Sequence, residues 1–135
     1  MKKEFDRKQG IGGSDATKLY NGEWHTLWLE KTGDAEPVDL SDVLPVQMGV
    51  HTEPFNIAWF EKQTGLNSKK QADKYKAQIQ HYLMVTGYSK LYFSAFYGNM
   101  KWEALEITAD AEFQEQLLNA EVLFWHFVQT KKEPP

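Results

Sequence analysis

The chain has no cysteine, no excess of positive charge and no long apolar segment. Without cysteine, neither a disulfide nor a zinc site built on thiolates can form. A net charge of −4 argues against broad, nonspecific binding to nucleic acid, which usually requires a basic surface. No apolar run approaches the roughly 18 residues that a membrane-spanning helix needs. We therefore expect no membrane association and a cytoplasmic location.

The apolar content is sufficient for one small core. The 135 residues are 41% hydrophobic and 14% aromatic, which suits a single domain over residues 1–135. Gly12-Gly13-Ser14-Asp15 predicts a turn into a first helix that ends at about residue 20, with Ser14 or Asp15 as its N-cap. Further helices are predicted at about residues 26–32, 46–64, 72–86 and 110–129.

Two of these helices carry patterns that predict which side chains are buried. Phe55, Ala58 and Trp59 form one stripe of the helix that should end at Gly65. The last helix has an apolar period of the helical type, and Asp110 is a suitable N-cap for it. The helix over 72–86 places four side chains at helical spacing and should stop at Gly87: Tyr75, Ile79, Tyr82 and Leu83.

Between the last two helices the period changes to that of strands. Residues 90–97 are aromatic and β-prone, Gly98-Asn99 is a turn dipeptide, and residues 101–108 form the returning strand. Both faces of the first strand are apolar, and strands of that kind are usually covered on both sides. The sequence thus predicts an α+β fold with one hairpin.

Several segments resemble one family. Arg7 through Leu19, Leu27 through Gly33, Glu61 through Leu66 and Gln78 through Gly87 appear in the order found in the YqaJ-type viral recombinases, relatives of lambda exonuclease with the PD-(D/E)xK nuclease fold. The resemblance implies a reduced restriction-endonuclease-like core. About five helices would then pack on a small antiparallel sheet formed by the hairpin at 90–108.

The resemblance also implies roles for individual residues. In that family an arginine and a serine hold the 5′-phosphate of a DNA end, and these correspond to Arg7 and Ser14. A planar guanidinium matches phosphate oxygens, and a glycine-rich helix N-terminus offers amide donors to an anion. Gln78 and Tyr82 correspond to residues that orient the catalytic groups and the scissile strand, and Glu53 to a glutamate near the metal site. Structural alternatives stay open: Ser14 as a cap, Arg7 and Glu53 as solvated charges, Tyr82 as core.

This sequence lacks the residues that form the metal site of such nucleases. The family supplies an Asp on one strand and Glu-x-Lys on the next, and two-metal hydrolysis needs such carboxylates. Here a short polar connector separates Leu66 from Tyr75, and the whole chain contains no Glu-x-Lys. The four histidines lack the spacing of metal ligands: His25, His51, His81 and His126. We therefore predict a nuclease-like protein with no metal, no cofactor and no catalytic activity.

Three functions fit such a protein. It could bind and inhibit a host nuclease or a CRISPR-type defence complex, bind DNA ends as a recombination accessory protein with the 5′-phosphate site retained, or be a non-functional deletion of an exonuclease. Loss of the catalytic strands would leave one face of the hairpin uncovered, with Tyr92, Phe96 and Trp102 on it. We expect that face to bind a protein partner or a second copy, giving a homodimer. The alternative is that the segment at 34–44 covers it.

Overall fold

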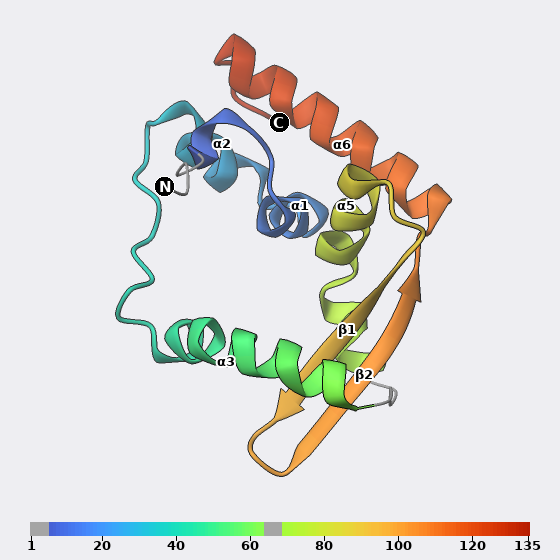
Figure 1. Ribbon diagram of the computed structural model, residues 1–135. Coiled ribbons are helices and arrows are strands. Elements are labelled where there is room, and N and C mark those ends of the chain that lie inside the picture. Colours follow the sequence, from blue (N-terminus) through green and yellow to red (C-terminus); the bar gives the residue numbers. More distant parts are fainter. Residues whose placement is uncertain (1–5, 64–68) are drawn as a thin grey trace. The chain divides into compact units, whose positions relative to one another are not determined.

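The computed structural model describes residues 6–63 and 69–135 (Figure 1). The described residues form six α-helices, a short 3-10 turn and a two-stranded antiparallel sheet, which confirms the predicted α+β class. They divide into two compact units, and each is described here by itself. The first unit comprises the segments up to Pro37, Tyr75–Tyr88 and Ala109–Pro135, and the second comprises Val38–Lys74 and Ser89–Thr108. A single domain over the whole chain stays a prediction.

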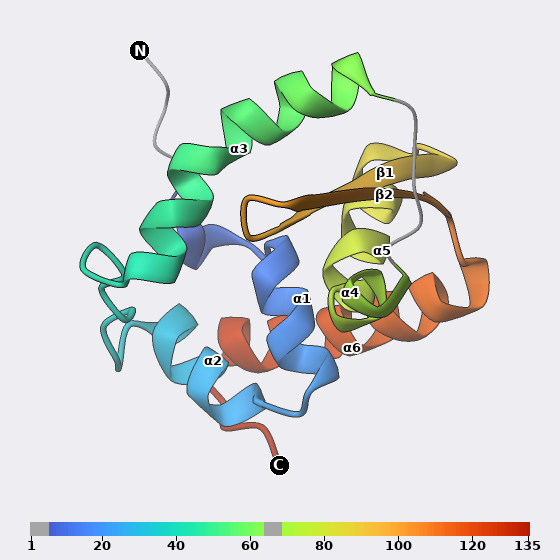
Figure 2. The ribbon, with the colours of Figure 1, turned by 90° about the horizontal axis from the view of Figure 1, so that it is seen from below.

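The first unit is helical. Its elements are the 3-10 turn η1 (Arg7–Gln9), α1 (Gly13–Tyr20), α2 (Trp24–Thr32), α5 (Lys76–Thr86) and α6 (Ala111–Thr130). Helix α1 packs against α2, α5 and α6 (Figure 2). The centre of this packing is a cluster of Leu19, Leu27 and Phe124, with four partly buried side chains around it: Ile11, Trp24, Trp28 and Val128.

The ends of these helices partly confirm the prediction. Asp110 caps α6, because its carboxylate accepts a hydrogen bond from Phe113 N at 3.0 Å. The predicted cap of α1 is wrong: the N-cap is Gly12, and Ser14 and Asp15 already lie within the helix. The carboxylate of Asp15 instead reaches back and accepts from Gly12 N at 2.9 Å. Such a contact is available to an acidic residue at the third helical position.

The helix predicted over residues 72–86 is interrupted. Helix α4 (Lys69–Lys74) belongs to the second unit, and α5 starts after Tyr75, which leaves the helical region at φ −102 and ψ 14. The hydrophobic period of residues 72–86 gave no sign of this break at Tyr75. A single residue with a changed backbone angle can redirect the chain while the spacing of its apolar residues stays the same. Helix α5 ends as predicted, with Gly87 in the left-handed region at φ 71.

The second unit contains α3 (Leu44–Lys62), α4 and the hairpin of β1 (Lys90–Tyr97) and β2 (Lys101–Thr108). The strands begin and end where the sequence predicts. In the register of the hairpin, Phe96 lies opposite Trp102 and Tyr92 lies opposite Glu106. These four side chains therefore share one face of the sheet.

Helix α3 lies against that face. Asn56 Nδ2 donates to the carbonyl of Ser94 at 3.1 Å. The ring of Phe55 stacks on Phe96, with 5.5 Å between the centroids and 18° between the planes. Helix α3 thus supplies the cover that was expected to be missing, or to come from the segment at 34–44.

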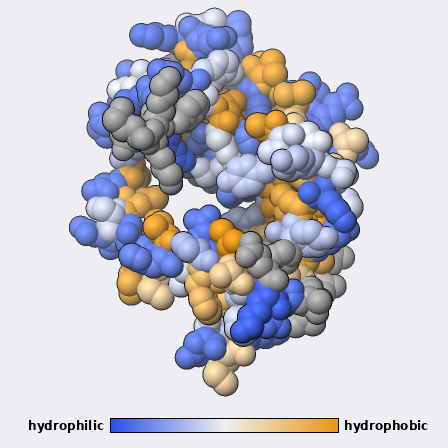
Figure 3. Space-filling view, viewed as in Figure 1, coloured by the Kyte–Doolittle hydropathy of each residue, from blue (hydrophilic) through white to orange (hydrophobic). Residues whose placement is uncertain are grey.

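The burial predicted for α3 is wrong for two of three residues. Phe55 is 58% exposed and Ala58 is exposed, whereas Trp59 is half-buried. The helix presents apolar side chains around much of its circumference, and within its unit it contacts the hairpin along one line, so the rest stay accessible. Figure 3 shows apolar surface over α3, where the exposed residues are Leu44, Val46, Met48, Val50, Phe55 and Ile57. The predicted stop at Gly65 lies outside the described residues.

Candidate anion-binding site

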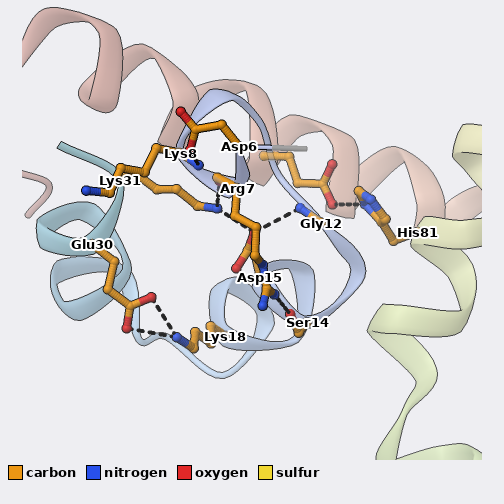
Figure 4. Close-up of polar contacts among 11 residues, drawn as sticks. Asp6, Arg7, Lys8, Gly12, Ser14, Asp15, Lys18, Glu30, Lys31 and His81 are labelled. Carbon is orange, nitrogen blue, oxygen red and sulfur yellow. Dashed lines mark hydrogen bonds and ion pairs between the residues drawn. The ribbon is translucent and has the colours of Figure 1, made fainter. Parts of the chain in front are cut away.

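The structure brings Arg7 and Ser14 together at the start of α1. Arg7 Nη2 donates to Ser14 Oγ at 3.0 Å, and both side chains are exposed. The two residues lie seven positions apart, so the contact requires the chain to turn back between η1 and α1 (Figure 4). A guanidinium carries five N–H donors in a planar fork, so one bond to a hydroxyl leaves donors that can reach phosphate oxygens.

The N-terminus of α1 adds backbone donors at the same place. The first hydrogen bond within the helix runs from Ala16 N to Gly12 O, at 3.0 Å. The amides of Gly13, Ser14 and Asp15 precede it and have no carbonyl within the helix to bind. Gly12 has no side chain that could cap them. Amides without a helical partner and the positive end of the helix dipole favour an anion near Ser14, the exposed residue of this first turn.

Helix α5 approaches this turn closely at Gly13. A Cβ atom on Gly13 would lie 2.6 Å from Tyr82 Cε1 and 2.9 Å from Gln78 Cγ, so only glycine leaves room for these two side chains. Gln78 Nε2 in turn donates to the Tyr82 hydroxyl at 2.8 Å. Tyr82 is 46% exposed, and the alternative that it belongs to the core is wrong. Four of the predicted residues thus meet at one turn: Arg7, Ser14, Gln78 and Tyr82.

A buried ion pair supports the same turn, and the sequence analysis missed it. Lys31 Nζ lies 2.7 Å from Asp15 Oδ2 and donates to the carbonyl of Arg7 at 2.6 Å. Figure 4 shows the Lys31 side chain reaching across to Arg7 and Asp15. Asp15 and Lys31 lie in two segments that resemble the family, Arg7 to Leu19 and Leu27 to Gly33. Nothing in their spacing indicated that they would pair.

A second buried pair links α5 to α6. His81 Nδ1 lies 2.7 Å from Glu121 Oε1, and both side chains are buried. The preceding residue, Gln80, is also buried, and its side-chain oxygen accepts a hydrogen bond from Asp110 N at 2.9 Å. These contacts hold α5, which carries Gln78 and Tyr82, at a defined place on α6.

The predicted place of Glu53 near a metal site stays a prediction. This glutamate is an exposed residue of α3 in the second unit. In residues 6–63 and 69–135, no three His, Asp or Glu side chains are grouped so that they could hold a metal ion. The absence of a metal and of catalysis in the whole chain stays a prediction.

The proposed interaction surface of the hairpin needs correction. Phe96 and Trp102 do not lack cover, because Phe55 stacks on the first and Trp59 meets the second edge-on at 6.5 Å between centroids. Tyr92 remains 50% exposed. Its hydroxyl donates to the Glu106 carboxylate, and this bond together with Lys90 lowers the pKa of Glu106.

The structure thus gathers hydrogen-bond donors at the glycine-rich start of α1 in an α+β chain. The model of the YqaJ-like viral recombinase domain matches residues 4–72. The chain therefore belongs to the YqaJ-like viral recombinase family, as its motifs predict. No curated protein and no solved structure matches it. In the described part of the chain, no helix is both long and apolar enough to cross a membrane.

Proposed function

We propose that the protein binds the 5′-phosphorylated end of a DNA strand and does not cut it. The observation that carries the proposal is the hydrogen bond between the exposed side chains of Arg7 and Ser14 at the first turn of α1. A guanidinium, a hydroxyl and the amides of a first helical turn together match the oxygens of a terminal phosphate. No other part of the two units gathers donors of these three kinds in the described residues.

Two further features favour a DNA end over a free anion, and a third favours a local site over a long duplex. The family to which the chain belongs consists of recombinases, whose relatives act on DNA. Tyr82 lies beside Gly13 and is 46% exposed, so the accessible part of its side chain could contact the sugar or base that carries the phosphate. The net charge of −4 suits recognition at one local site better than contact along a long duplex.

The binding test compares two forms of one DNA duplex, with a 5′-phosphate or a 5′-hydroxyl at a recessed end, at fixed salt. The wild-type protein should prefer the phosphorylated form, and Arg7→Ala should lower that preference by about tenfold or more, the value of a charge-assisted hydrogen bond. Lys8→Ala is the matched control, because it removes one positive charge from the same 3-10 turn. It should weaken both forms equally. An unchanged preference in Arg7→Ala would refute the proposal.

The absence of cutting rests on the missing Glu-x-Lys sequence. Linear duplex DNA incubated with the protein and Mg²⁺ or Mn²⁺ should keep its length over hours. Digestion that proceeds from the ends, and that is lost in Glu53→Ala, would show that the chain is an active nuclease.

A second candidate function is binding to a protein, as a non-catalytic inhibitor of a host nuclease or a CRISPR-type defence complex. The exposed apolar side chains of α3 favour it, since contiguous apolar surface usually marks a place for a partner. The negative net charge also favours it, because an acidic protein can compete with DNA for a basic groove. A homodimer through the same surface belongs to this proposal.

Met48→Glu tests the second candidate, with Val122→Glu as its control. Both place a charge at an exposed apolar position, but Val122 lies on α6 in the first unit. If α3 binds a partner, Met48→Glu alone should abolish inhibition of the host nuclease. Sedimentation at micromolar concentration tests the homodimer: a wild-type monomer would exclude it.

A further inference from the structure

Lys31 is a buried cation directly behind the candidate site. The side chains of Lys31 and Asp15 are 5% and 7% exposed, and their charged atoms are 2.7 Å apart. Lysine is almost never fully buried without a partner. A pair of this kind adds little stability relative to apolar side chains of the same size, because both charges lose their hydration. The pair therefore matters more for the backbone that it restrains than for stability.

The pair holds both ends of the loop between η1 and α1. At one end Lys31 Nζ donates to the carbonyl of Arg7, at 2.6 Å. At the other end Asp15 Oδ2, which accepts from Lys31, also accepts from Gly12 N at 2.9 Å. The loop contains Gly10 and Gly12, and glycine has more backbone freedom than any other residue. One ammonium group and one carboxylate thus restrain a segment that its own sequence leaves flexible.

We infer that Lys31 is a positioning residue for the 5′-phosphate site. It orients Arg7 through the backbone, and it does not touch the DNA. Arg7 bonds to Ser14 across the loop that Lys31 and Asp15 restrain, so the bond is made only while the Arg7 backbone is held near the start of α1. This inference rests on the proposed binding of a 5′-phosphate.

A neighbouring ion pair provides a matched control. Lys18 Nζ lies 2.9 Å from Glu30 Oε2, and this pair also joins α1 to α2. In the described part of the chain, Lys18 and Glu30 bond to each other and not to Arg7, Gly12 or Asp15, and their side chains are more exposed than those of the Lys31 pair. Loss of the Lys18 pair therefore removes a link between the same two helices without releasing the loop.

The experiment measures the ratio of affinities for the 5′-phosphorylated and 5′-hydroxyl duplexes. Lys31→Met should reduce this ratio by about tenfold, toward the value of Arg7→Ala, because the charge-assisted bonds of Arg7 are no longer aligned with the phosphate. Lys18→Met should leave the ratio unchanged. The ratio reports positioning, since a general loss of folded protein lowers both affinities by the same factor.

Lys31→Met leaves the Asp15 carboxylate buried without its partner, and that can unfold the protein. The double variant Lys31→Met with Asp15→Asn removes both charges, and the new amide oxygen can still accept from Gly12 N. If this variant is folded by circular dichroism and has lost the ratio, the inference holds. If it is folded and keeps the wild-type ratio, the inference is overturned.

The outcomes also separate this inference from the proposed function. If Arg7→Ala loses the ratio while both Lys31 variants keep it, only the positioning role is wrong. If the wild-type protein shows no preference for the phosphate, or Arg7→Ala keeps it, the proposed function fails and the positioning role fails with it.

Discussion

Each of the two units of this chain is stabilised by a different kind of internal contact. In the described residues of the first unit, Leu27 and Phe124 are fully buried, and the Lys31–Asp15 ion pair and the hydrogen-bonded pair of His81 and Glu121 are enclosed. Among the residues of the second unit whose burial the structure describes, the buried apolar ones are Ala72 and Ala104, and the aromatic contacts lie at partly exposed positions. Since large buried side chains contribute most to stability, the first unit should be the more stable one.

The comparison has a meaning for function. The candidate anion site lies entirely in the first unit, on helices that are packed and paired. A phosphate site needs side chains that are already in place before the ligand binds. The exposed apolar side chains of α3 belong to the second unit, and less stable segments are those that most often rearrange on a partner. The two candidate functions therefore belong to units of different rigidity.

The largest effect is expected from the core of the first unit. Phe124 is fully buried against Leu19 and Leu27, and Phe124→Ala should reduce the free energy of unfolding by about 4 kcal/mol. Phe96→Ala in the second unit should cost clearly less, because the Phe96 ring is partly exposed. Urea denaturation followed by circular dichroism measures both. Equal losses would contradict the proposed difference between the units.

The next effect concerns the buried pair between α5 and α6. Glu121→Ala leaves His81 buried without its hydrogen-bond partner and should cost about 2 kcal/mol. The double variant Glu121→Leu with His81→Leu should recover most of that loss, since it removes both polar groups. A double variant as unstable as Glu121→Ala would show that the pair contributes more than mutual compensation.

Two tryptophans of the second unit allow a finer comparison. Trp102 Nε1 donates to Ser94 Oγ at 2.8 Å, so Trp102→Phe should cost about 1 kcal/mol for the lost bond, in addition to lost packing. Trp59 Nε1 is buried and has no hydrogen-bond partner among the described residues. Trp59→Phe should therefore cost less than Trp102→Phe. Thermal unfolding of the two variants side by side decides the order.

The smallest effect is a dependence of stability on pH at the start of α6. The hydrogen bond from Phe113 N, and then the one from Lys76, lower the pKa of Asp110 below its usual 3.8. A carboxyl whose pKa is lowered by folding stabilises the protein above its unfolded pKa and loses that contribution as pH falls through the folded value. The stability difference between wild type and Asp110→Asn should thus be constant near neutral pH and shrink below about pH 4. A difference that stays constant down to pH 2 would contradict this.

The sequence by itself determined several local elements, and its motifs indicated the family. The ends of β1 and β2, the cap of α6 at Asp110 and the stop of α5 at Gly87 follow from turn residues, capping residues and periodicity, which act between neighbours in the chain. The motif around Arg7 and Ser14 also predicted that these side chains meet. The family match to residues 4–72 agrees with the motifs.

Only the tertiary structure decided how distant segments serve the site. The pairing of Lys31 with Asp15, the pairing of His81 with Glu121 and the close approach of Tyr82 to Gly13 depend on which helices lie side by side. Periodicity records that a side chain faces inward or outward, but it carries no information about which partner it meets. From its sequence context alone, Lys31 is expected to be solvated. Only the packing of α2 against α1 places it beside the buried carboxylate of Asp15.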